Sequence, residues 1–77
     1  MSNIIEFDIN KFAERLKELR TEAGLGKNKL AEILELSNAS ISYWENRKQE
    51  PSASAIYKLA GFFKVSSDYL LGISDLT

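Results

Sequence analysis

The sequence predicts an all-α protein with a compact five-helix domain, and three observations support that prediction. The chain has 77 residues, which is enough for one hydrophobic core and too few for two. It contains only one Pro and four Gly, so few positions break a helix. Its apolar residues recur at spacings of three and four, which is typical of helices that bury one face.

The first helix is expected over residues 9–23. Asp8 precedes it as a good N-cap residue, because a short carboxylate can accept hydrogen bonds from the free N–H groups of the first turn. Phe7 and Phe12 stand at the positions of a hydrophobic staple, which packs the chain before the helix against its first turn. Gly24 supplies the left-handed residue that ends a helix.

The second and third helices follow as a closely spaced pair. The second is expected over residues 27–34, after a short turn that contains Gly26. Ser37 is the expected N-cap of the third helix, over residues 38–46. The spacing of Ile41 and Trp44 places both on the inner face of this helix; the predicted pair therefore covers about residues 27–46.

Two more helices follow the only proline of the chain. Ser52 is the expected N-cap of the fourth helix, over residues 53–63, and Ser66 caps a short fifth helix, over residues 67–71. Gly72 then ends the fifth helix.

The helices divide the chain into three parts. Residues 1–8 form an N-terminal arm, for which an extended segment and a short edge strand both fit the alternation of apolar and acidic residues. Residues 9–72 form the domain. Residues 73–77 are expected to form a frayed C-terminal tail.

Composition excludes most catalytic and metal-binding chemistry. The chain has no Cys and no His, which removes disulfides, thiolate sites and the usual zinc ligand sets. Its carboxylates fall mostly on outward helix faces beside Lys or Arg, and no Gly-rich phosphate loop is present. We therefore expect a protein that is not an enzyme and has neither a metal nor a cofactor.

The sequence also lacks signals for a membrane. No apolar run approaches the ~20 residues of a membrane span, and the N-terminus lacks the basic and apolar regions of a signal peptide. We expect a cytoplasmic protein without a membrane partner. Its net charge of −1 does not by itself favour nucleic-acid binding.

The start of the predicted third helix nevertheless suits an approach to DNA. It opens with three short side chains, those of Asn38, Ala39 and Ser40. Free N–H groups at a helix N-terminus attract anions, and small residues let that end enter a major groove about 12 Å wide. Helix-turn-helix proteins place the second helix of the pair on base edges in this way.

The sequence resembles the Cro/repressor-type helix-turn-helix family of phage repressors and bacterial regulators. The resemblance is carried by FAERLKELRTEAGL, KLAEILELSNASISYWEN and EPSASAIYKLAGFFKVSSDYLLG, which together cover about residues 9–72. It implies a lambda-repressor-like fold. It also implies a sequence-specific regulator that binds double-stranded DNA, expected here to be a repressor that binds a palindromic operator as a homodimer.

The resemblance implies a role for each matching position. The residues that would read bases are Asn38, Ala39, Ser42 and Tyr43. Those that would contact phosphates are Lys27, Ser37, Ser40, Asn46, Arg47 and Lys48. An ion pair between Arg20 and Glu45 would join the first helix to the end of the third. Arg47 stands where many family members have Gly, which predicts a less tight turn after the third helix.

The implied dimer needs an apolar surface, for which the candidates are Tyr57, Phe62, Leu71 and Ile73. Phe62 is large where family members usually have a small residue.

Two other functions use the same domain. The chain could be an antitoxin or a restriction–modification controller, or a protein-interaction module that has lost DNA binding, which its isoelectric point of about 5.4 makes possible.

Overall fold

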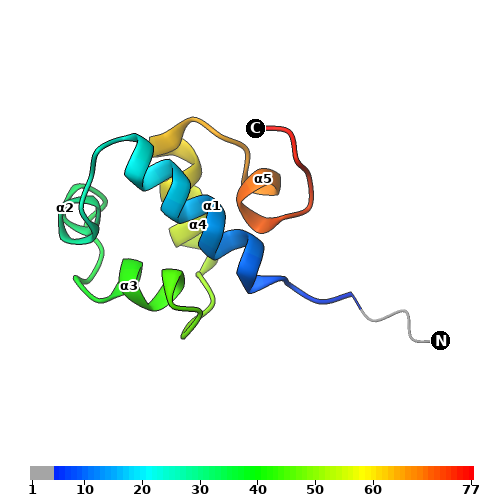
Figure 1. The fold of residues 1–77 in the computed structure, drawn as a ribbon, viewed down its shortest axis with the longest axis horizontal. Coiled ribbons are helices and arrows are strands. Elements are labelled where there is room, and N and C mark those ends of the chain that lie inside the picture. Colours follow the sequence, from blue (N-terminus) through cyan, green and yellow to red (C-terminus); the bar gives the residue numbers. More distant parts are fainter. Residues whose placement is uncertain (1–4) are drawn as a thin grey trace.

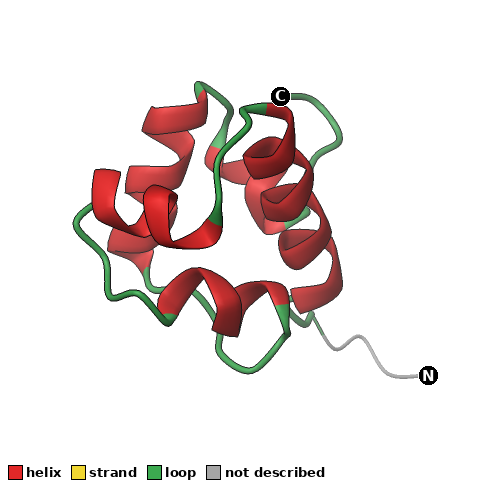
Figure 2. Cartoon of the chain, turned by 60° about the vertical axis from the view of Figure 1, so that its left-hand side comes forward, coloured by secondary structure: helices red, strands yellow, loops and turns green. Residues whose placement is uncertain are grey.

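The computed structural model describes residues 5–77, which form five helices and no strand (Figures 1 and 2). The helices are α1 (Ile9–Glu22), α2 (Lys27–Ile33), α3 (Ser40–Glu45), α4 (Ala53–Phe63) and α5 (Ser67–Leu71). The predicted all-α architecture is confirmed. Residues 1–4 of the predicted arm lie outside the described residues, and residues 5–8 do not form the edge strand that the sequence allowed.

Side-chain caps fix the starts of three helices as predicted. Asp8 accepts a hydrogen bond from the N–H of Asn10 at 2.9 Å, ahead of α1. Ser52 Oγ accepts from the N–H of Ala55 at 3.1 Å at the start of α4. Ser66 does the same for α5, through the N–H of Tyr69 at 3.0 Å. These hydrogen bonds satisfy amides that have no partner within the helix, and so define where each helix begins.

The start of α3 differs from the prediction. The helix begins at Ser40, two residues later than expected, and its N-cap is Ala39. Ser37 is not the cap, because its hydroxyl pairs with the hydroxyl of Ser40 at 2.7 Å. The N–H of Ser40 donates to the carbonyl of Ser37 at 3.1 Å, which closes a turn over residues 37–40. Asn38 therefore lies in the turn ahead of α3.

The core takes large side chains from every helix. α1 packs against α3 and α5, α2 packs against α3, and α4 packs against α5. The largest fully buried side chains are Phe12, Leu16, Leu30, Ile41, Leu59 and Leu70. Trp44 lies edge-on to Phe12, with ring centroids 6.1 Å apart and an interplanar angle of 72°. The inner face of α3 is thus held against α1 by apolar packing.

The C-terminal tail folds back onto the domain (Figure 1), where the sequence predicted fraying. Arg15 of α1 donates to the carbonyl of Ser74 at 2.9 Å and to the carboxylate of Asp75 at 2.6 Å. Its guanidinium also lies over the ring of Tyr69, 4.2 Å from the centroid, and donates to that residue's carbonyl. One largely buried guanidinium therefore holds the tail to two helices.

No helix in the described part of the chain is long and apolar enough to cross a membrane.

Candidate nucleic-acid interface

α3 has two chemically different faces. Ile41 and Trp44 are buried in the core on its inner face. On its outer face Tyr43 is 45% exposed, and Ser42 is half-buried. In the turn before the helix, Asn38 is exposed and Ala39 half-buried. The four residues expected to read bases therefore lie in the turn before α3 and on the face of α3 that points away from the core.

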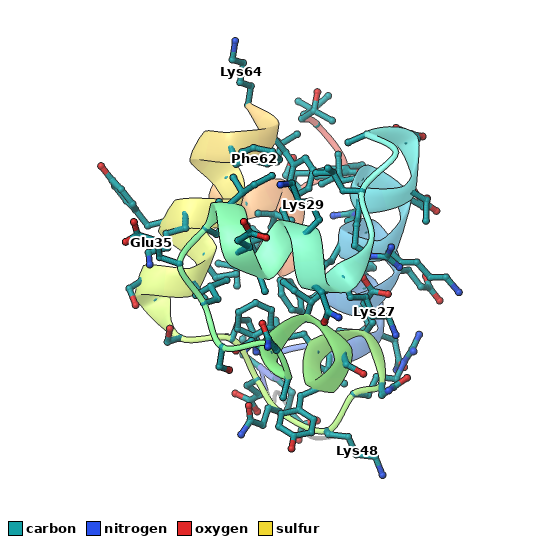
Figure 3. The ribbon with its side chains drawn as sticks, turned by 90° about the vertical axis from the view of Figure 1, so that its left-hand side faces the viewer. Lys27, Lys29, Glu35, Lys48, Phe62 and Lys64 are labelled. Carbon is teal, nitrogen blue, oxygen red and sulfur yellow. The ribbon has the colours of Figure 1, made fainter. Side chains whose placement is uncertain are left out.

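The residues expected to contact phosphates lie around α3. Lys27 is the first residue of α2, and Lys48 follows the end of α3; Figure 3 shows them on either side of α3. Asn46 caps the end of α3 and donates to Ser42 Oγ at 3.2 Å. Ser37 and Ser40 share one hydrogen bond, so the hydroxyl that accepts it keeps its proton for a further partner, and both oxygens keep acceptor capacity.

Arg47 is held by the protein itself. Its backbone adopts a left-handed conformation, with φ of 60°. Its N–H donates to the carbonyl of Trp44 at 3.1 Å, and the N–H of Lys48 donates to that of Tyr43 at 2.8 Å. These two hydrogen bonds form the Schellman motif that usually ends in Gly. The predicted loosening of this turn is therefore wrong, because Arg47 takes the conformation that Gly would take.

The Arg20–Glu45 ion pair joins α1 to the last residue of α3. Arg20 Nε donates to Glu45 Oε2 at 2.7 Å and Nη2 donates to Oε1 at 2.9 Å. The two side chains are only 10% and 4% exposed, and Nη1 of Arg20 donates to the carbonyl of Leu25 at 2.9 Å. Hydrogen bonding to Glu45 raises the pKa of Arg20 above its ordinary value, against the opposing effect of burial.

A polar depression of about 490 Å³ lies beside this ion pair. Its lining comes from α1, the start of α2 and the end of α3, and its cations are Lys17, Lys27, Arg20 and Arg47. Glu14 and Glu45 also line it, and they are paired with Arg47 and Arg20. Among residues 5–77, Lys27 and Lys48 form no ion pair, so their charges are available to an anion.

The four dimer candidates belong to two separate apolar patches. Leu71 and Ile73 lie in a groove of about 540 Å³, the arm patch, which also includes Ile5, Phe7 and Pro51. Tyr57 and Phe62 lie in a groove of about 330 Å³, the α4 patch, which also includes Ile33. Ile5, Ile73 and Tyr57 are 98%, 72% and 83% exposed. The structure thus divides a set that the sequence treated as one surface.

A family model described as helix-turn-helix matches residues 16–70. The chain belongs to the helix-turn-helix family. The match runs from α1 to α5 and includes α2 and α3, the two helices of the motif. This confirms the resemblance to Cro/repressor-type proteins.

Two curated relatives are transcriptional regulators. The chain is 36% identical over 64 residues to the HTH-type transcriptional regulator ImmR of Bacillus subtilis (strain 168), covering 83% of this chain and 50% of ImmR. It is 38% identical over 66 residues to the HTH-type transcriptional activator BcrR of Enterococcus faecalis, covering 86% of this chain and 32% of BcrR. The chain therefore spans half or less of the length of these two relatives.

The fold is shared with a repressor solved on DNA. The structure matches the P22 c2 repressor protein in complex with a synthetic operator, with a TM-score of 0.73 and 30% sequence identity. The match covers 78% of this chain and 91% of that chain. It confirms the predicted repressor-like five-helix fold.

Proposed function

We propose that this domain binds double-stranded DNA sequence-specifically and regulates transcription. The observation that carries the proposal is the division of α3 into a core face, with Ile41 and Trp44, and a solvent face, with Tyr43 and the preceding turn. A short helix anchored on one side and open on the other suits insertion into a major groove. The likeness to the P22 c2 repressor, solved with a synthetic operator, supports the same use of the fold.

In this proposal, the turn and the outer face of α3 read the bases. The Asn38 carboxamide is exposed and can bond an adenine edge through one donor and one acceptor. The Ala39 methyl group can contact a thymine methyl group. Ser42 and Tyr43 follow along α3 and offer hydroxyls to neighbouring base edges.

The surrounding polar residues bind the DNA backbone. The proposed phosphate contacts are Lys27, Ser37, Ser40, Asn46 and Lys48. Lys27 stands at the start of α2, where the free N–H groups of the helix add to its charge. Since Lys27 and Lys48 are the cations among these contacts, one subunit neutralises about two phosphates, so a monomer binds DNA weakly and loses affinity as the salt concentration rises.

We propose that the protein overcomes this weakness as a homodimer on a palindromic operator, which doubles the number of contacts. The arm patch is the better candidate for the interface. It includes Glu50 and Pro51, which lie in the loop between α3 and α4, so a partner docked there would lie beside the reading helix. It also contains Ile5, which at 98% exposed exceeds Tyr57 of the α4 patch at 83%.

We propose that the domain represses transcription, acts in the cytoplasm and performs no catalysis. A protein that occupies an operator can exclude a polymerase with no further contact, whereas activation requires an additional productive one. BcrR is named an activator, so the direction of control needs its own test. When the selected site is placed over a reporter promoter, a repressor should lower expression of the reporter. Higher expression would instead assign the domain as an activator.

The proposal is tested by selection from a random-sequence duplex pool at ~50 mM and ~200 mM salt. The expected result is enrichment of one site with two-fold symmetry, bound more weakly at the higher salt. If no site is enriched and binding does not depend on salt, the domain is not a DNA-binding module and a protein partner becomes the better candidate.

A further inference from the structure

We propose that Arg47 is a positioning residue for α3: its guanidinium ties the end of this helix to α1 and is not used as a phosphate contact. This inference rests on the proposed DNA-binding function, in which α3 is the reading helix. It gives Arg47 a different role from Lys48, the next residue in the chain.

The backbone at Arg47 calls for an explanation. Its φ of 60° lies in the left-handed region that glycine adopts without steric conflict. A non-glycine residue at the end of a Schellman turn is strained, because its Cβ approaches the neighbouring carbonyl. Glu35 and Lys64 bear the same backbone cost, and at Arg47 the bonds of the side chain offset it.

Three nitrogens of the Arg47 guanidinium have protein partners. Nε donates to Asn10 Oδ1 at 2.6 Å, and Nη1 donates to the carbonyl of Glu45 at 3.0 Å. Nη2 lies 3.8 Å from Oε1 of Glu14. Asn10 and Glu14 are four residues apart on α1 and so lie on the same side of that helix. The planar fork of arginine can address these acceptors together, which the single ammonium of lysine cannot.

Two guanidinium groups therefore meet at the last residue of α3. Arg20 comes from α1 and binds the carboxylate of Glu45. Arg47 comes from the turn after α3, binds the carbonyl of the same residue and reaches back to α1. Apolar packing of Ile41 and Trp44 sets the inner face of α3, and these directional bonds restrict its rotation and tilt.

A phosphate contact by Arg47 would compete with this arrangement. Nε and Nη1 are already bonded within the protein, so a phosphate would have to compete with Glu14 for Nη2 of a side chain that is 40% exposed. Lys48 is exposed and forms no ion pair within residues 5–77, so it can bind a phosphate without such a loss. Positioning by Arg47 and phosphate binding by Lys48 are thus the roles that fit their surroundings.

The test compares wild type, Arg47→Lys, Arg47→Gln and Lys48→Ala, using the selected site and a random-sequence duplex over a range of salt concentrations. For both Arg47 variants, positioning predicts that affinity for the selected site falls about five- to tenfold. It also predicts that affinity for the random duplex and the salt slope stay unchanged. Lys48→Ala should weaken both affinities alike and lower the salt slope by about one.

Two results would overturn the proposal. One is that Arg47→Lys binds both duplexes as wild type does while Arg47→Gln shows a lowered salt slope, which assigns Arg47 to a phosphate. The other is an equal fall of both affinities with an unchanged salt slope, which reports only a smaller folded fraction. A purely structural role does not change the ratio of specific to non-specific affinity, so that ratio is the decisive readout.

A second measurement needs no DNA and separates this inference from the proposed function. Asn10→Ala should raise the unfolding equilibrium constant about threefold in wild type, and should have no effect in Arg47→Lys. This coupling is expected even if the wild-type domain selects no DNA site, in which case only the proposed function fails. Equal effects of Asn10→Ala in both backgrounds would show that Arg47 does not tie α3 to α1.

Discussion

The guanidinium of Arg20 and the carboxylate of Glu45 form a bidentate, largely buried ion pair, at 2.7 and 2.9 Å, between α1 and the end of α3. Arg20→Met removes one partner and leaves the Glu45 carboxylate buried without its counterion. We expect a loss of about 3–5 kcal/mol in the free energy of unfolding, measured by urea denaturation with the fluorescence of Trp44.

The exposed pair of Lys29 and Glu32, 3.9 Å apart on α2, is the matched control. Lys29→Gln should change the free energy of unfolding by less than about 0.5 kcal/mol, because solvent screens that pair. The double variant Arg20→Met with Glu45→Met should recover most of the stability. A loss below about 1 kcal/mol in Arg20→Met would show that the ion pair contributes little.

The raised pKa of Arg20 fixes the sign of its pH dependence. Because the folded-state pKa lies above the unfolded value, the stabilisation from the Arg20 charge is fully present below the unfolded pKa. It is lost only as the pH rises through the folded-state value. Stability curves measured between about pH 6 and 9 should therefore show no loss that depends on Arg20, and a loss present in wild type but absent from Arg20→Met would contradict this.

Left-handed residues offer a second stability test. Glu35 and Lys64 have φ of 56° and 57°, at the ends of α2 and α4. Lys64→Gly should raise the free energy of unfolding by about 1 kcal/mol, because glycine adopts this conformation without strain. In the reverse control, Gly24→Ala should lower it by a similar amount, since the added Cβ meets no atom within 4 Å and only the backbone is affected. Destabilisation by Lys64→Gly in thermal unfolding would refute this explanation.

Arg15 is expected to hold the C-terminal tail. Arg15→Ala removes the hydrogen bonds to Ser74 and Asp75, so backbone amides of residues 73–77 should exchange faster with deuterium. Asp75→Asn removes only the charge of an 88% exposed partner and should leave exchange nearly unchanged. Equal exchange in wild type and Arg15→Ala would mean that other contacts hold the tail.

The arm patch is tested by Ile73→Glu, which places a charge in the proposed dimer interface. Light scattering should then give the mass of a monomer at concentrations where wild type is a dimer. Tyr57→Glu is the control, because Tyr57 is 83% exposed and belongs to the α4 patch. A dimer that survives Ile73→Glu but is broken by Tyr57→Glu would move the interface to the α4 patch.

Local signals explain how much of the fold was predictable. Asp8, Ser52 and Ser66 cap helices through bonds within three residues, and Gly24 and Gly72 end helices through their own backbone. Such features depend on neighbouring residues only, and α4 and α5 have the predicted bounds. The predicted start of α3 was wrong because the Ser37 hydroxyl bonds the hydroxyl of Ser40 and does not cap the helix.

Contacts between residues far apart in the sequence were harder to predict. Arg15 binds Ser74, 59 residues away, and Arg47 binds Asn10, 37 residues away, with no pattern in the sequence to indicate either. The Arg20–Glu45 pair was expected only through the family resemblance. Periodicity shows which side of a helix is buried, but it does not show which polar groups meet across the fold.

The most direct test of DNA reading by α3 and the turn before it compares the sites selected by wild type and by Asn38→Ala from one random-sequence duplex pool. Asn38 is exposed in the turn before α3 and makes no core contact that its removal would disturb. We predict that both proteins select the same two-fold symmetric site, with the variant losing preference at one base pair in each half-site, at about 1–3 kcal/mol. Identical base preferences in the two selections would show that Asn38 reads no base, and the absence of any selected site for wild type would contradict base reading by α3 and its preceding turn.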